Sequence, residues 1–401
     1  MRTVSSLSVL GVFAVLGLGA CKETTGPRTG DPIRVGVAVA LTGSLAVEGL
    51  DARRGYELWA EFVNTERGGL LVDGVRRPVE LLIRDDASNA ATSAQLVAEL
   101  IDVERVDFLL GPYGSAATLT TSAVAEEKGT IMIAPNGASE EIYTRGFANT
   151  FGILTPGREY TKAAIERLAE RGARTMVLAQ ETGSAFSASV GQGALAWAAA
   201  NGLTVLAVLE YPREASDLSA VIDAANALAP DVFIGGGHFA DAVRFTRTAA
   251  QRGFSPPAML LTVGPGGPEF TAALGDTANG VLGPTQWDRT MGWQGEAFGT
   301  PAQYAARYAA RFGTPPTYQA AQSTAGGVVL GHAIEAANST ASDAVRARLR
   351  TMDLMTFYGP VRFDATGKNI AKPMGVVQVQ GGASVVVAPS AIAVGALRYP
   401  R

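Results

Sequence analysis

The chain contains one cysteine, Cys21, and two histidines, His238 and His332. A single thiol cannot form a disulfide within the chain, so the fold has to be stable without one. Two histidines that lie far apart in the sequence do not form a zinc-binding motif, and we predict no metal site. Positive charge is not in excess either: the formal net charge is -4 and no block of lysines and arginines occurs. These absences argue against a nucleic-acid-binding protein.

Motifs of the common enzyme classes are also missing. The sequence has no Gly-x-Ser-x-Gly elbow, no Walker loop and no His-Glu-x-x-His pair. The glycine runs at 235–237 and 264–267 do not fit a dinucleotide-binding fingerprint. We therefore predict a protein that is not an enzyme and that needs no cofactor.

Long apolar runs are confined to the N-terminus. Arg2 precedes an apolar run from Leu7 to Ala20, which is too short for an ordinary membrane span but typical of a signal-peptide core. The following Leu18-Gly19-Ala20-Cys21 resembles the lipobox of bacterial lipoproteins. We predict a signal peptide at 1–20, lipidation of Cys21, and a polar, flexible tether at 21–30. The alternative is an ordinary secretory signal followed by an incidental cysteine.

From Ile33 onward, apolar strands alternate with helices, a pattern typical of a parallel sheet covered by helices on both faces. One such set ends near Thr155-Pro156-Gly157, and a second set begins at Arg174. About 370 residues are also too many for one compact core. The fold class predicted is therefore α/β, with two doubly wound, Rossmann-like lobes. Strands are expected at 33–40, 79–83, 106–110, 131–134, 175–179, 205–209, 232–234, 259–262, 361–363 and 376–379, and helices at 90–101, 117–127, 188–200, 218–228, 240–252, 302–311 and 320–337.

A series of short motifs resembles the type I periplasmic binding proteins of the branched-chain amino acid and amide family. The motifs span the mature chain in the family's order, which makes the set more specific than any one member. They are 33–44 with Gly49, Gly68-Gly69, Asp73-Gly74, Asp85-Asp86, 111–115, Ala134-Pro135, Gly235-Gly236, Gly275-Asp276, and Tyr358-Gly359-Pro360 with Phe363-Asp364.

The resemblance implies a two-lobed protein with three chain crossovers near residues 155, 285 and 357. Lobe 1 would comprise 31–155 and 286–355, and lobe 2 would comprise 156–285 and 356–401. It also implies that the lobes close on a small amino-acid-like, amide or carboxylate ligand and deliver it to the permease of an ABC importer. The protein would be exported and held at the outer face of a membrane. The alternative is a sensor that presents such a ligand to a membrane receptor.

Two loops follow neighbouring strands, at the sheet edge where open α/β folds bind ligands. Ser115 ends one loop and starts a helix, and 136–139 form the other. Backbone N–H groups at a helix start and a serine hydroxyl suit a carboxylate. The resemblance assigns carboxylate binding to Ser115 and to the main chain of Asn136 and Ala138. The family often has a hydroxyl where Ala138 stands, so Ser139 is the alternative donor. Ser115 as a simple helix cap is the structural alternative.

A free amino acid also brings an ammonium group, and burying that group without a carboxylate is costly. The family places a glutamate in the second lobe for this purpose, but here that position falls near Val263. Glu48, at a position that is usually aromatic, and Glu181, after a second-lobe strand, are the possible substitutes. An exposed surface acid is the alternative for each.

The aromatic positions of the family have changed as well. Thr182 and the pair His238-Phe239 stand where the family usually carries tyrosine. His238 could donate a hydrogen bond in the cleft. Trp287, beside the second crossover, is a candidate wall of the cleft, with core packing as the alternative.

The lipoprotein hypothesis gives a direct prediction. Replacing Cys21 with serine removes the thiol that would carry the lipid, so the variant should accumulate unprocessed or leave the membrane fraction. Cell fractionation and intact-mass measurement check this. A variant with unchanged membrane association and mass contradicts lipidation.

Overall fold

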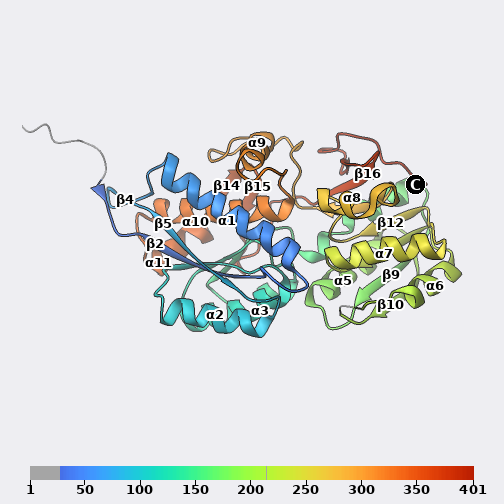
Figure 1. Ribbon diagram of the computed structural model, residues 1–401, viewed down its shortest axis with the longest axis horizontal. Helices are drawn as coiled ribbons and strands as arrows, with labels where there is room; N and C mark the ends of the chain where they lie inside the picture. Colours follow the sequence, from blue (N-terminus) through green and yellow to red (C-terminus); the bar gives the residue numbers. More distant parts are fainter. Residues whose placement is uncertain (1–27, 214) are drawn as a thin grey trace, which may run out of the picture.

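The computed structural model describes residues 28–213 and 215–401, which form two α/β lobes side by side (Figure 1). The predicted signal peptide, Cys21 and residues 21–27 of the tether lie outside the described residues. The remaining residues of that tether are not free: Arg28–Thr29 form strand β1, and the Gly30 N–H donates to the Arg76 carbonyl over 2.8 Å.

The first lobe is built on a parallel sheet of five strands in the order β5-β2-β6-β7-β8. Its strands are β2 (Ile33–Val39), β5 (Val79–Asp85), β6 (Phe108–Leu110), β7 (Met132–Ala134) and β8 (Thr150–Gly152). Side chains on the two faces of each strand enter separate cores. Val37 and Phe108 pack under α1 (Ala46–Glu66) and α10 (Tyr318–Ala337). Ala38 and Leu109 pack under α2 (Ala90–Asp102) and α3 (Ser115–Glu127).

The second lobe has a sheet of seven strands in the order β10-β9-β11-β12-β13-β16-β17, of which the last two pair antiparallel. The strands are β9 (Thr175–Glu181), β10 (Thr204–Tyr211), β11 (Val232–Gly236), β12 (Ala258–Leu261), β13 (Leu282–Thr285), β16 (Gly375–Gln380) and β17 (Ala383–Ala388). One face is covered by α6 (Ser219–Leu228), α7 (Phe239–Arg252) and α8 (Pro268–Leu274). The other is covered by α4 (Lys162–Glu170) and α5 (Ala185–Ala200).

The remaining elements extend the first lobe. Helices α9 (Pro301–Phe312) and α11 (Ser342–Arg350) add to its core, as does the hairpin of β14 (Asp353–Thr356) and β15 (Gly359–Arg362). Strands β3 (Leu70–Val72) and β4 (Val75–Arg77) form a small sheet with β1. Single turns of 3-10 helix are η1 (Glu140–Tyr143), η2 (Gly157–Glu159) and η3 (Gly275–Ala278).

Close packing of α1 against α10 depends on glycine. A Cβ atom at Gly327 would lie 2.2 Å from the Trp59 ring, and one at Gly55 would lie 2.3 Å from the Ala320 carbonyl oxygen. Both distances are shorter than any van der Waals contact, so only glycine allows the backbones to approach this far. Helix α10 is consequently buried on most of its surface, which explains its many small and apolar residues.

The alternation of strands and helices predicted from the sequence is confirmed, and the fold is the two-lobed α/β architecture. Missing from the prediction were several short elements: β3, β4, β8, β13, β14, β17, α4, α8 and α11. These elements are three to nine residues long. So few residues do not show the hydrophobic period of 2 of a strand or 3.6 of a helix clearly.

Three chain segments connect the lobes, and one side chain holds all three together. Gln286, which is fully buried, lies on the second segment just after β13. Its Oε1 accepts from the Thr155 N–H over 3.0 Å and from Lys372 Nζ over 3.1 Å, and its Nε2 donates to the Thr155 carbonyl over 2.9 Å. Tyr358 donates its hydroxyl hydrogen to the same Oε1 over 3.1 Å. Thr155 and Lys372 stand on the first and third segments, so one amide links every crossover.

The third crossover lies later in the chain than the boundary drawn from the sequence. Phe357, Tyr358, Val361 and Phe363 belong to the hydrophobic core of the first lobe. Residues 356–363 therefore pack with the first lobe, because β15 pairs with β14 and not with the second sheet. We propose that lobe 1 extends to about Phe363 and that the hinge segment begins there.

Removing the Gln286 amide should destabilise the protein. In Gln286→Leu the side chain keeps similar bulk, but the buried Thr155 N–H and carbonyl, the Tyr358 hydroxyl and the Lys372 ammonium each lose a partner. Tyr358 keeps its bond to Gln322 and Lys372 its bond to the Gln286 carbonyl, so the Thr155 N–H and carbonyl are the groups left unsatisfied. Such groups cost about 1–3 kcal/mol each, so we expect a loss of about 2 kcal/mol or more. Urea unfolding measures it. Gln251→Leu, on the exposed face of α7, is the matched control; equal stability of the two variants would contradict the role given to Gln286.

Candidate functional site in the cleft between the lobes

Ser115 joins the two first-lobe loops that face the second lobe. It is the first residue of α3, and Gly114 before it adopts a φ of 91°, a value that favours glycine. The Ser115 Oγ accepts from the Ala138 N–H over 3.1 Å and from the Ser139 N–H over 3.0 Å. Within the described part of the chain no acceptor lies within hydrogen-bond distance for its own hydrogen. Ser115 is thus not a simple helix cap, and its hydroxyl can donate into the cleft.

Asn136 and Ser139, the other predicted contacts of this loop, have structural partners. The Asn136 amide bonds to Ser323 over 3.0 Å and accepts from Gln322 over 2.6 Å. The Ser139 hydroxyl accepts from the Glu141 N–H over 3.3 Å and so caps the turn η1. Ser139 Oγ is thus engaged as an acceptor in a cap, and its donation to a ligand stays a prediction.

The second lobe presents an apolar wall to these loops. Val263, which is 2 % exposed, packs in one cluster with Phe186, Tyr160 and Ala138, so residues of both lobes share this core. The position where the resemblance leads one to expect an acid is therefore fully apolar. His238 lies against the same wall, with its ring centroid 5.0 Å from that of Phe186.

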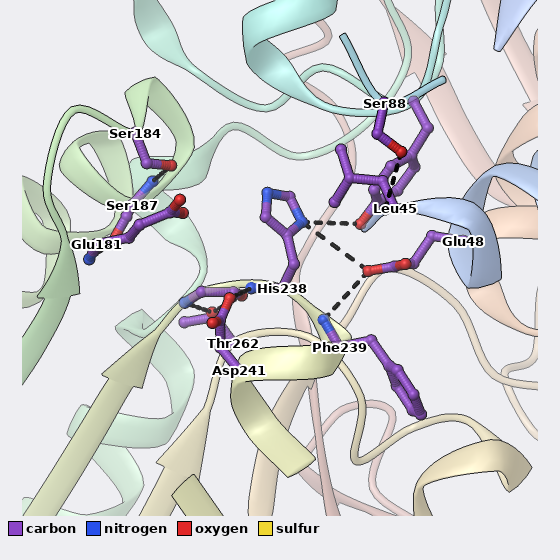
Figure 2. Close-up of polar contacts among 12 residues, drawn as sticks. Leu45, Glu48, Ser88, Glu181, Ser184, Ser187, His238, Phe239, Asp241 and Thr262 are labelled. Atoms are coloured by element: carbon purple, nitrogen blue, oxygen red, sulfur yellow. Dashed lines mark hydrogen bonds and ion pairs between the residues drawn. The ribbon is translucent and has the colours of Figure 1, made fainter. Parts of the chain in front are cut away.

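The two acids predicted near the cleft occupy different surroundings (Figure 2). Glu48 is 3 % exposed and accepts the Phe239 N–H over 3.1 Å, which connects α1 of the first lobe to α7 of the second. Burial raises the pKa of Glu48 to about 7, although the hydrogen bond from Phe239 opposes the shift. Glu181, at the end of β9, is 6 % exposed, and the Arg213 Nε lies 3.7 Å from its Oε1.

Two small cavities lie beside Ser115 and share Ser115, Tyr113, Phe186 and His238 in their walls. The inner one, about 10 Å³, is also lined by Asn136, Ala138 and Val263. The outer one, about 50 Å³, is also lined by Glu181 and Arg213. A cavity of the inner size accommodates about one water molecule, whereas pockets for small ligands are far larger. The lobes are therefore closed around Ser115, and a ligand at this place requires them to separate. Two larger cavities, of about 200 and 690 Å³, are also lined by residues of both lobes, but Ser115 lines neither of them.

Three of the predicted residues lie away from these cavities. Thr182 is exposed and lines neither of them. Phe239 contributes its backbone N–H to Glu48, and its ring lines neither cavity. Trp287 belongs to the first-lobe core, where its Nε1 donates to the Phe357 carbonyl over 3.1 Å. It also lines a separate cavity of about 200 Å³, which Gly267 of the second lobe lines as well.

The structure adds residues that the sequence did not indicate. Tyr160, Tyr318 and Gln322 line the inner cavity, the first from the crossover after η2 and the other two from α10. Tyr113 belongs to the first loop motif but had not been assigned a role. The local sequence gives little signal for Tyr318 and Gln322: their spacing of four places them on one side of α10, but the same stretch of the helix also contains Gln319, Ser323 and Thr324.

Neither a metal cluster nor a membrane-spanning helix occurs in the described ranges. No group of three or more His, Cys, Asp or Glu side chains within 28–213 and 215–401 is arranged to hold a metal ion. In the same residues no helix is both long and apolar enough to cross a bilayer.

A family model described as periplasmic binding protein matches residues 32–383. The match covers most of the chain, so the chain belongs to the periplasmic binding protein family, whose members bind solutes and are not enzymes. Leu/Ile/Val-binding protein homolog 7 of Brucella abortus (strain 2308) is 24 % identical over 406 residues, which cover 96 % of this chain and 98 % of the relative.

Solved structures of such proteins share the fold. A branched-chain amino acid transporter substrate-binding protein from Streptococcus pneumoniae, in complex with isoleucine, superposes with a TM-score of 0.79 at 20 % identity, over 89 % of this chain and 100 % of the other. A solute-binding protein from R. palustris, in complex with benzoate, gives 0.76 at 19 % identity, over 90 % and 99 %. Together with the family match, these likenesses identify the fold as that of type I periplasmic binding proteins.

The Ser115 geometry predicts a measurable loss of stability. Ser115→Ala removes the acceptor of two buried N–H groups, those of Ala138 and Ser139, so unfolding should become easier by about 1–3 kcal/mol. Urea unfolding tests this, with the exposed Ser255→Ala as control. A Ser115→Ala protein as stable as the control would show that these two bonds contribute nothing.

Proposed function

We propose that this protein is the substrate-binding lipoprotein of an ABC importer and that it captures a small apolar carboxylate between its lobes. The observation that carries the ligand class is the asymmetry of the cleft. One side offers hydrogen-bond donors around Ser115, and the other side is apolar around Val263. Aromatic carboxylates, and branched carboxylates that lack an amine, have this same asymmetry.

The donor side suits a carboxylate for two reasons. The free Ser115 hydroxyl hydrogen points to an acceptor-rich ligand group, and the N-terminus of the 13-residue helix α3 favours negative charge. The Ala138 N–H, which bonds to Ser115 within the first lobe, is a second donor for which a ligand carboxylate can compete, since the family uses the main chain at this position.

The apolar side disfavours an ammonium group. The inner cavity is lined by Val263, Phe186, Tyr160 and Leu154, and its lining includes no aspartate or glutamate. Glu48 is already bonded to the Phe239 N–H. A zwitterionic amino acid would therefore bury its ammonium without a countercharge, which is costly. That a similar fold in R. palustris holds benzoate is consistent with a ligand that has no amine.

A branched-chain amino acid is the second candidate, and one observation favours it. Glu181 lines the outer cavity and is 6 % exposed, so an ammonium group reaching from the inner to the outer cavity would meet this carboxylate. Arg213, 3.7 Å from Glu181, would then have to move aside.

Delivery to an importer follows from the family, and a lipid at Cys21 would keep the protein beside its permease. A sensor that presents the same ligand to a receptor remains the rival function. Deleting the gene separates the two, because an importer subunit is needed for uptake of labelled ligand, whereas loss of a sensor leaves uptake intact and abolishes the response.

Titration calorimetry with three ligands tests the proposed chemistry. Benzoate and 4-methylpentanoate, which is leucine without its amine, should bind at least about tenfold more tightly than leucine, because an unpaired buried ammonium costs more than 1.4 kcal/mol. Leucine as the tightest ligand would refute the carboxylate proposal and favour the Glu181 site.

The variant Val263→Glu provides the converse test. It supplies the acid that the cleft lacks, so leucine should bind more tightly than to the natural chain and benzoate more weakly. Val263→Gln, of equal size but uncharged, controls for the change in volume. If leucine gains equally in both variants, charge is not the reason.

A further inference from the structure

Glu48 and His238 bring the two lobes together at the mouth of the cleft (Figure 2). Glu48 lies in the first turn of α1, in the first lobe, and its Oε1 accepts the Phe239 N–H at the start of the 14-residue helix α7. His238 immediately precedes α7, and its Nδ1 lies 4.0 Å from the Glu48 carboxylate and 3.3 Å from the Tyr113 hydroxyl. These contacts exist only while the lobes are closed.

Both groups are withdrawn from water in this arrangement. Glu48 is 3 % exposed, and the His238 side chain, 16 % exposed, lies against the rings of Phe186 and Tyr113 with centroids 5.0 and 5.7 Å away. An isolated charge at either position would be costly, because burial removes its hydration without returning a strong countercharge.

The charged groups around the pair do not supply that countercharge. Asp51, on α1, and Asp241, on α7, are acids near Glu48, and the nearby Tyr113 and Tyr318 are neutral phenols at ordinary pH. Arg213 faces Glu181. Among the described residues, the only basic side chain within 4.0 Å of Glu48 is His238 itself.

Burial consequently shifts the two groups in opposite directions. It raises the pKa of Glu48 from 4.5 to about 7. It lowers the pKa of His238 from 6.5 to about 4, a shift that Asp241 opposes and Arg213 reinforces. The Tyr113 hydroxyl stays protonated, so it can donate to an unprotonated Nδ1 and favours the neutral imidazole.

When the lobes part, both side chains regain water, and the pKa of each returns toward its ordinary value. At mildly acidic pH the open form then carries a charged Glu48 and a largely protonated His238, whereas the closed form holds both neutral. We propose that Glu48 and His238 form a proton-exchanging latch: as the lobes close, the carboxyl gains a proton and the imidazole loses one, so the interface buries no net charge. The latch rests on the proposed function, in which closure captures the ligand.

The signs of the two contributions are opposite. The raised pKa of Glu48 in the closed form favours closure at low pH, and this contribution is lost as the pH rises from about 4.5 through 7. The lowered pKa of His238 in the closed form favours closure at high pH, and this contribution is lost as the pH falls from 6.5 toward 4. The two windows overlap, so closure of the natural chain should depend little on pH although each partner alone titrates strongly.

Single substitutions should reveal how each partner alone makes the closed-to-open ratio depend on pH. Glu48→Gln keeps an oxygen for the Phe239 N–H but cannot titrate, so its closed-to-open ratio should fall about tenfold between pH 8 and 5.5. His238→Gln leaves Glu48 alone, so its ratio should rise about thirtyfold over the same interval. The natural chain should change less than about threefold. The double variant should again be flat, and it serves as the matched control.

The closed fraction can be measured from distances between spin labels on the two lobes. Exposed Val103 and Val208 accept the labels after Val103→Cys and Val208→Cys substitution in the full chain carrying Cys21→Ser. Distances are recorded without ligand, with benzoate and with leucine, after urea unfolding has shown that each variant folds. If the closed fraction changes with pH in the same way in the natural chain and in the single variants, the latch is refuted. It is also refuted if none of the proteins shows the label distance of the closed form.

The outcome separates the latch from the proposed function. If neither benzoate nor leucine binds in calorimetry, but the single variants still show opposite pH slopes without ligand, the proposed ligand class fails and the latch stands. If a ligand binds and the slopes are absent, the latch fails and the ligand class stands.

Discussion

The fold depends on one buried side-chain amide at the junction of the lobes. Gln286 bonds simultaneously to Thr155, Tyr358 and Lys372, and so ties together chain segments that lie 72 to 131 residues from it in the sequence. Its hydrogen bonds have no water to replace them, because Gln286 is fully buried. The hinge is therefore a fixed point, and the two rigid sheets can move mainly by rotation about it.

A fixed hinge makes the opposite side of the interface the place where binding energy is gained. Ligand and protein groups that meet there lose water together, so each polar group needs a partner in the closed form. The first lobe meets this need with donors around Ser115, and the second with apolar contacts around Val263. Glu48 and His238 are the exceptions, and a proton exchange between closed and open forms resolves their cost.

Site residues that follow directly after a strand could be located from the sequence. Ser115, Ala138, Val263 and His238 lie in such loops, because parallel strands all end at one edge of their sheet. Tyr160, Tyr318 and Gln322 could not be located, since they reach the cavity from helices or crossovers whose position depends on how the lobes pack. Thr182 was misleading for the related reason that the residue after a strand can turn to solvent.

The sequence by itself determined the α/β class and the order of the main strands and helices, because hydrophobic periodicity is a local property. It also marked Ser115 and the missing acid at Val263, through motifs in a recognisable order. The tertiary structure decided how those residues are used. Contacts between segments far apart in the chain place the Glu48 carboxylate on the Phe239 N–H, the Trp287 indole on the Phe357 carbonyl, and residues 357–363 in the core of the first lobe. Such contacts carry no local signal, since they depend on packing of the whole molecule.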